Sequence, residues 1–168
     1  TSAVQLSSGP MVVYRDRSPK EIRDISFVLG KSHKWSKPTT LKIDNWLMPG
    51  CPVNGASIDT FGNLVAVSRF TVIQNKAQVI LRLFNEGQMK SGTEIVLDED
   101  IPIGHCATVC TKDLINTVWI GFEKNQAVLK LAQVSLDGKI KRKTTLTPIG
   151  GSRSSGMPRA IFSGGYLW

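Results

Sequence analysis

The sequence has no apolar run near the ~20 residues that an α-helix needs to cross a bilayer, so we expect no membrane span. Aromatic residues make up only 7% and are not interleaved with the basic ones, which makes nucleic acid an unlikely partner. No Gly-rich phosphate loop or Cys-x-x-Cys pair occurs, so we expect neither a cofactor nor a metal. The chain opens at Thr1 without an initiator Met or signal peptide, which indicates a processed, trimmed or incomplete chain.

Cysteine is scarce, with only three residues: Cys51, Cys106 and Cys110. An odd number argues against a complete disulfide framework. Cys106 and Cys110 are an even number of residues apart on a segment predicted to be a buried strand, so both side chains face the same side of it. This pattern favours buried thiols in the core over a zinc site.

Acidic residues are outnumbered, because 21 Lys and Arg face 13 Asp and Glu and the formal charge is +8. The basic residues are scattered, apart from a cluster at positions 139–143 that follows Asp137-Gly138. That cluster is typical of a solvated hairpin tip. Two alternatives stay open: a basic protein with no special partner, or one with an anionic partner such as an acidic glycan.

The chain contains an internal repeat of about 50 residues, which lies within the range of propeller blades. Four classes of β-branched and aromatic segments recur in the same order, separated by turn signals such as Phe61-Gly62-Asn63 and Asn85-Glu86-Gly87. No stretch shows a helical period over three turns. The copies of the first class begin at Ala56, Ala107 and Arg159.

These repeats predict an all-β fold, a β-propeller of four-stranded antiparallel blades, in preference to a β-sandwich or a solenoid. We expect blades at residues 2–43, 55–97 and 106–147, and an incomplete blade at 158–168. About three and a half blades of a six-bladed ring are then present, so the chain is a fragment, a partly traced subunit, or half of a ring completed by another copy. Ile58, Val109 and Ile161 are expected to be equivalent buried positions on the innermost strands.

Three sequence motifs resemble those of sialidase-like β-propellers. They are Arg23-Asp24-Ile25, then Asp44-Asn45-Trp46 followed by Cys51-Pro52-Val53-Asn54-Gly55, and finally Ser155-Gly156-Met157-Pro158-Arg159. Ala56 replaces the usual proline of the second motif. The order and spacing of the motifs also agree with this family, which is named for its BNR repeats, or Asp-boxes.

The resemblance implies Asp-boxes in the hairpins between third and fourth strands, where Asp and Ser close the turn and Trp packs between strands. Here the boxes are degenerate. The hairpin at residues 30–38 keeps Trp35 but lacks the Asp, and Ser135-Leu136-Asp137-Gly138 is a shorter remnant. We expect Trp35 to pack and His33 to be exposed at the hairpin tip.

The resemblance also places ligand-binding candidates at the mouth of the central channel. They are Arg23, Asp24, Asp44, Trp46, Asn54, His105 and Arg159. A sialidase holds the substrate carboxylate with three arginines and uses a Tyr nucleophile backed by a Glu. His105 stands where relatives have the middle arginine, and Tyr14 and Tyr166 lie within expected strands. The catalytic residues are therefore unknown, and the alternative is that Arg23, Asp24 and Arg159 lock adjacent blades together.

Three functions follow from this reading. The first is a non-catalytic propeller module for binding or assembly, whose partner is another protein chain or further blades that complete the ring. The second is a fragment of a sialidase-like exo-glycoside hydrolase acting on acidic glycans. The third is a lectin-like, carbohydrate-binding propeller. The resemblance favours an extracytoplasmic location, whereas three cysteines without an evident pairing point the other way.

Overall fold

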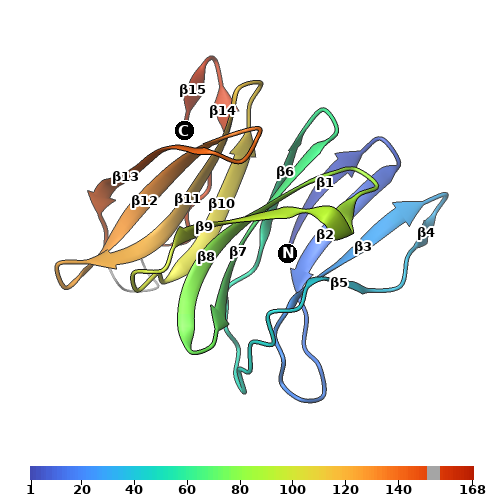
Figure 1. The fold of residues 1–168 in the computed structure, drawn as a ribbon, viewed down its shortest axis with the longest axis horizontal. Coiled ribbons are helices and arrows are strands. Elements are labelled where there is room, and N and C mark those ends of the chain that lie inside the picture. Colours follow the sequence, from blue (N-terminus) through green and yellow to red (C-terminus); the bar gives the residue numbers. More distant parts are fainter. Residues whose placement is uncertain (151–155) are drawn as a thin grey trace.

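The computed structural model describes residues 1–150 and 156–168, and within them the protein is all-β. Sequential antiparallel strands form three sheets, which stand side by side in chain order (Figure 1). The only helix in the described part is a single 3₁₀ turn, η1 (Met89–Ser91). No helix in this part is long and apolar enough to cross a membrane. The expected all-β fold and its four-stranded antiparallel sheets are therefore confirmed.

The first sheet has one strand more than expected. It contains β1 (Ser2–Leu6), β2 (Gly9–Arg15), β3 (Ile25–Lys31), β4 (Lys34–Trp35) and β5 (Thr39–Lys42). Both β4 and β5 pair with β3, at its end and its beginning. The tight β3–β4 hairpin has positive φ angles at Ser32 (48°) and His33 (63°), a pair of values typical of the two-residue type I′ turn.

The second and third sheets each consist of four strands in sequence order. The second contains β6 (Ser57–Phe61), β7 (Leu64–Ile73), β8 (Lys76–Asn85) and β9 (Thr93–Asp98); the third contains β10 (Gly104–Cys110), β11 (Leu114–Glu123), β12 (Gln126–Ser135) and β13 (Ile140–Pro148). A separate hairpin, β14 (Phe162–Ser163) and β15 (Tyr166–Leu167), follows them.

Two apolar layers hold the three sheets together. The first layer lies between the first and second sheets and includes Met11, Ile25 and Val67. The second lies between the second and third sheets and includes Leu81 and Trp119. The second sheet is therefore covered on both faces, which explains why β7 and β8 are almost continuously apolar. Each fully buried large side chain contributes roughly 1.5–3 kcal/mol.

The first strands of the three sheets are neighbours, since β6 contacts both β1 and β10. Side chains on one such strand accept hydrogen bonds from the backbone of the next. The Ser57 hydroxyl accepts from Thr108 N (3.0 Å), and the Asp59 carboxylate accepts from Cys110 N (2.7 Å). These bonds fix how β6 and β10 lie against each other, in addition to the apolar layers.

The expectation of three equivalent buried residues is wrong. Ile58 is buried at 4% exposure, but Val109 is half-buried and Ile161 is 60% exposed. Ile161 precedes the two-stranded β14–β15 hairpin and has no full sheet around it. Trp35 was also expected to pack, yet it is 56% exposed, because β4 lies at the outer end of the β3–β4 hairpin. His33 is exposed, as expected.

Side-chain hydrogen bonds of Ser135 and Asp137 close the turn between β12 and β13. The Ser135 hydroxyl hydrogen-bonds the Asp137 carboxylate and also bridges to Lys139, whose N donates to it at 3.2 Å. Gly138 has a φ of +87°, which a residue with a Cβ adopts only with strain. These bonds lower the pKa of Asp137 to about 2, with the Ser135 hydroxyl as the first cause and Lys139 next.

Candidate functional site

Three loops meet at one end of the sheets: the β2–β3 loop, the segment between β5 and β6, and the β9–β10 loop. Arg15, at the end of β2, links the first two of these loops to β7 through hydrogen bonds. Its Nε donates to the Asn54 carbonyl (2.8 Å), and its two Nη atoms donate to the carbonyls of Arg23 (2.6 Å) and Phe70 (2.5 Å). Burial lowers the pKa of Arg15 to about 10, which still leaves the guanidinium charged at neutral pH.

Trp46 lies beneath Arg15, whose guanidinium carbon is 4.8 Å from the centre of the ring. The tryptophan is 8% exposed and meets Phe70 edge to face, with ring centroids 5.3 Å apart. This arrangement combines a cation–π contact with aromatic packing. Trp46 therefore packs between Arg15 of β2 and Phe70 of β7.

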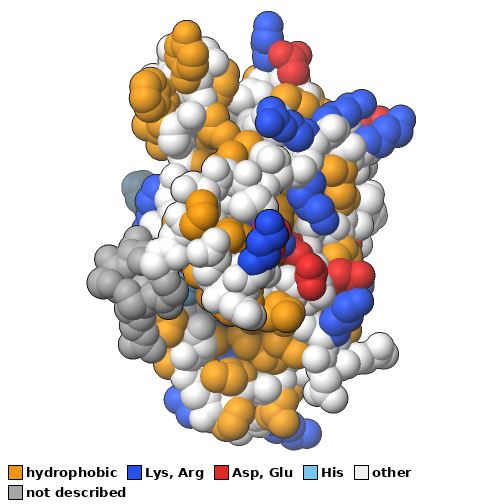
Figure 2. Space-filling model, turned by 90° about the vertical axis from the view of Figure 1, so that its left-hand side faces the viewer, with side chains coloured by type: hydrophobic (Ala, Val, Ile, Leu, Met, Phe, Trp, Pro, Cys, Tyr) orange, Lys and Arg blue, Asp and Glu red, His pale blue; other side chains and the backbone are white. Residues whose placement is uncertain are grey.

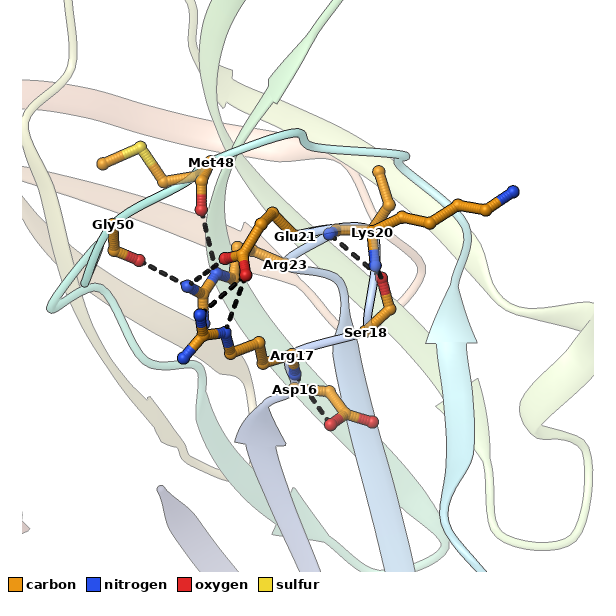
Figure 3. Close-up of polar contacts among 9 residues, drawn as sticks. Asp16, Arg17, Ser18, Lys20, Glu21, Arg23, Met48 and Gly50 are labelled. Atoms are coloured by element: carbon orange, nitrogen blue, oxygen red, sulfur yellow. Dashed lines mark hydrogen bonds and ion pairs between the residues drawn. The ribbon is translucent and has the colours of Figure 1, made fainter.

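The Arg23 guanidinium binds three neighbouring groups through Nε and Nη2 (Figure 3). Its Nε donates to the Met48 carbonyl (3.0 Å), while Nη2 donates to the Gly50 carbonyl (2.6 Å) and pairs with Glu21 (2.9 Å). Glu21 also pairs with the exposed Arg17 at 2.6 Å. With only 8% of the residue exposed, Arg23 holds the loop after β5 against the β2–β3 loop.

Asp24 and Asp44 are buried as well, and each has a partner. The Asp24 carboxylate accepts a long hydrogen bond from Trp46 N at 3.4 Å. Asp44 binds Arg69 through both oxygens, at 2.8 Å to Nε and 2.9 Å to Nη2. Arg69 lies on β7 with no exposed surface and also pairs with Glu94 at 2.9 Å. Arg69 was not among the predicted site residues, although a charged residue inside the apolar run of β7 indicates a buried ion pair.

Asn54 joins the second and third sheets through its side-chain amide. Its oxygen accepts from His105 N (2.7 Å), and its nitrogen donates to the Ile103 carbonyl (3.1 Å). Gly104 has a φ of +99°, and a Cβ there would lie 2.5 Å from the Asn54 oxygen. Burial lowers the pKa of His105, so its ring is neutral at neutral pH and supplies no cation at this end of the sheets.

A cavity of about 550 Å³ opens beside these residues. It is lined mainly by apolar side chains: Trp46, Met48, Cys51, Pro52, Val53, Phe70, Ile103, Ile120, Ala127 and Met157, together with Asn54, His105, Gly150 and Gly156. Arg23, Asp24 and Asp44 do not line it. The cavity thus suits an apolar group, because the charged groups nearby bind one another.

Arg159 is the predicted site residue that the structure does not bring into this cluster. It is exposed and does not line the cavity, although Gly156 and Met157 do. Neither tyrosine lines the cavity. Burial, followed by the charge of Asp16, raises the pKa of Tyr14, and Tyr166 is 68% exposed on β15. Within residues 1–150 and 156–168, no group of three or more His, Cys, Asp or Glu side chains could hold a metal.

No known family model matches this chain, and no curated protein matches it either. The class that the fold defines is therefore an all-β protein of sequential antiparallel sheets. The sialidase-like resemblance rests on the sequence motifs alone.

Proposed function

We propose that this chain is a non-catalytic, sialidase-like β-propeller module for binding and assembly, whose partner is another protein chain or further blades. The sheets serve as blades in this proposal, and their first strands lie toward the axis of the ring. The contacts of β6 with β1 and β10, and the repeated side-chain-to-backbone bonds between β6 and β10, support this arrangement.

The observation that carries the assembly function is the exposed apolar surface of the β14–β15 hairpin. Ile161, Phe162, Tyr166 and Trp168 have exposed fractions of 60%, 47%, 68% and 71%. Figure 2 has a group of hydrophobic side chains at its upper left, at the height where Figure 1 draws this hairpin. Grouped apolar side chains of this kind are typical of an interaction surface, and a short exposed strand pair can be extended by a partner strand.

The interactions at the end of the sheets support the non-catalytic part of the proposal. Arg23 donates to two carbonyls and pairs with Glu21, and Asp44 is bound by Arg69, so both groups have partners within the protein. A sialidase-type reaction needs free arginines for the substrate carboxylate and a tyrosine with a lowered pKa. The apolar cavity favours a second, lesser function: binding of a small apolar ligand at this end of the sheets.

Sedimentation velocity tests the assembly function. We expect wild-type chain to sediment above its monomer mass of 18.4 kDa in a concentration-dependent manner, and a Phe162→Ser/Trp168→Ser variant to stay monomeric. The control Phe61→Ser alters another exposed aromatic residue, 43% accessible, on the turn of the second sheet, and should behave as wild type. A wild-type monomer at every concentration, with the same mass as the variant, would contradict the proposal. Turnover of a fluorogenic sialoside would contradict its non-catalytic part.

A further inference from the structure

A second cleft lies at the opposite end of the first sheet, away from the site described above. Its volume is about 620 Å³, and residues of the β1–β2 turn and the β3–β4 hairpin line it. The lining side chains that matter here are Pro10, Lys31, His33, Lys34 and Trp35. In Figure 1 this hairpin lies at the right-hand edge of the molecule.

The exposed indole of Trp35 forms a flat surface in this cleft, and neighbouring residues on one side hold it in place. It pairs across the hairpin with Gly30. A Cβ on Gly30 would lie 3.3 Å from the Trp35 ring and 2.7 Å from Pro10, so the ring rests where only a glycine leaves room. Ser36 fixes the following residue, because its N donates to the Leu29 carbonyl at 2.8 Å and its hydroxyl accepts from Leu29 N at 3.0 Å. The indole is thus oriented by the backbone while 56% of the residue stays exposed.

The charge around this surface has one sign. Residues 31–43 contain four lysines and no Asp or Glu. Lys31 lies directly opposite Lys34 across the hairpin, a like-charge pair that destabilises a strand pairing. In the described part of the chain neither lysine forms an ion pair with a carboxylate. The hairpin also holds two non-glycine residues at positive φ, Ser32 and His33.

The exposed tryptophan and the two facing lysines do not stabilise the hairpin. They oppose the local consistency expected of a hairpin that serves structure alone. A bound anion would relieve the repulsion between the lysines through charge-assisted hydrogen bonds. The exposed indole offers an apolar face to a ring stacked on it.

We propose that this cleft binds an anionic polysaccharide, with a sugar ring stacked on Trp35 and its carboxylate or sulfate groups held by Lys31 and Lys34. A pyranose has an apolar C–H face for the indole and carries its acidic groups at the rim, which matches a platform flanked by cations. Single-stranded nucleic acid fits less well, because its binding depends on several aromatic residues that stack successive bases. Trp35 is the one Phe, Tyr or Trp side chain in the lining of the cleft. This inference does not depend on the proposed assembly function.

Isothermal titration calorimetry on the whole chain tests the proposal with four probes of similar length. They are a heparin-derived hexasaccharide, hexagalacturonate, maltohexaose and a hexathymidylate. We expect at least one of the two acidic sugars to bind, and the stronger of them identifies sulfate or carboxylate as the recognised group. Maltohexaose should bind at least about tenfold more weakly, since it lacks the charge that the lysines recognise.

Three variants and a matched control locate the binding. Trp35→Ala and Lys31→Gln/Lys34→Gln should each weaken the acidic sugar by about tenfold or more, while Trp35→Phe keeps most of the affinity. Lys112→Gln/Lys141→Gln removes the same charge from two exposed lysines of the third sheet and should leave binding unchanged. Circular dichroism of each variant checks the fold. The proposal is overturned if neither acidic sugar binds, or if the control substitutions weaken binding as much as the Trp35 and lysine substitutions do. It is also overturned if maltohexaose binds with the same affinity as the acidic sugars, or if hexathymidylate binds more tightly than they do through the same residues.

Discussion

At the scale of single residues, the buried charges decide how the sheets are held together. Asp44 follows the last strand of the first sheet and binds Arg69 of the second. Asp98 ends the second sheet and binds Lys130 of the third at 3.1 Å, while Trp119 Nε1 donates to it at 2.7 Å. The same arrangement therefore joins each sheet to the next: a carboxylate at the end of a sheet's last strand binds a cation on a central strand of the following sheet.

The Asp44→Asn variant tests this arrangement. Asparagine keeps the shape but leaves the buried Arg69 charge without its bidentate partner, so we expect a loss of roughly 3–5 kcal/mol in the free energy of unfolding. Urea denaturation measures it. The control Lys76→Gln breaks an exposed pair with Glu99, at 55% and 51% side-chain exposure, and should change stability by less than about 0.5 kcal/mol. A loss below about 1 kcal/mol for Asp44→Asn would mean that the carboxylate does not hold Arg69 in solution.

The three thiols should differ sharply in reactivity. Burial raises the pKa of Cys106 and of Cys110 to about 12, whereas Cys51 is exposed. Only the thiolate is nucleophilic, so we expect iodoacetamide at pH 8 to modify one cysteine per native chain and three after denaturation. Mass spectrometry identifies the site, and Cys51→Ser should abolish native labelling. Rapid labelling of Cys106 in native protein would contradict the buried placement of the β10 thiols.

At the scale of elements, one exposed carboxylate joins two turns of different sheets. Glu86, just after β8, accepts hydrogen bonds from Ser7 N (3.1 Å), from the Ser7 hydroxyl (2.9 Å) and from Ser8 N (2.8 Å) at the β1–β2 turn. The bonds from Ser8 and then Ser7 lower the pKa of Glu86 from 4.5 to about 2. The folded state thus binds this proton less readily than the unfolded chain does.

Stability should consequently depend on Glu86 in acid. The contribution of this carboxylate is fully present above pH 4.5 and is lost as the pH falls toward about 2. We expect Glu86→Gln to lower the urea midpoint at pH 6 and to reduce the further drop between pH 6 and pH 3. Asp113→Asn, which changes an exposed carboxylate on the β10–β11 turn, should follow the wild-type curve. Parallel curves for wild type and Glu86→Gln would show that the turns are not joined in solution.

The elements could be predicted from the sequence because their signals are local. Alternating β-branched residues and turns such as Phe61-Gly62-Asn63 indicate strands and hairpins wherever the chain goes. The carbonyl partners of Arg23 and the ion-pair partner of Asp44 could not be predicted, since they lie on segments 25 residues or more away in the sequence. Trp35 was placed wrongly for a related reason: whether a hairpin tip is covered depends on what lies beside it, and that is a property of the whole fold.

At the scale of the whole molecule, burial is distributed unevenly. The second sheet has an apolar layer on each face, while the outer face of the third sheet is covered only in part. There, Ala160 and Leu167 pack against a small cluster of Ala107, Val118 and Leu131. The exposed apolar surface of the β14–β15 hairpin is thus continuous with the part of the third sheet's outer face that the hairpin leaves uncovered. Local stability should therefore be highest in the second sheet and lowest at the β14–β15 hairpin, since it depends on buried contacts.

Hydrogen exchange followed by mass spectrometry tests this gradient and its relation to assembly. In dilute protein we expect amides of β7 and β8 to exchange slowest, because both faces of their sheet are covered, and amides of β14–β15 to exchange fastest. Raising the protein concentration should slow exchange in β14–β15, where the molecules are proposed to associate. Exchange in β4 should not change, because β4 is equally short and exposed but lies in the proposed polysaccharide cleft, outside the association surface. The Phe162→Ser/Trp168→Ser variant should lose the concentration dependence. If β14–β15 is as protected as β7 at the lowest concentration, the hairpin is covered by its own chain, and an association through this surface is excluded.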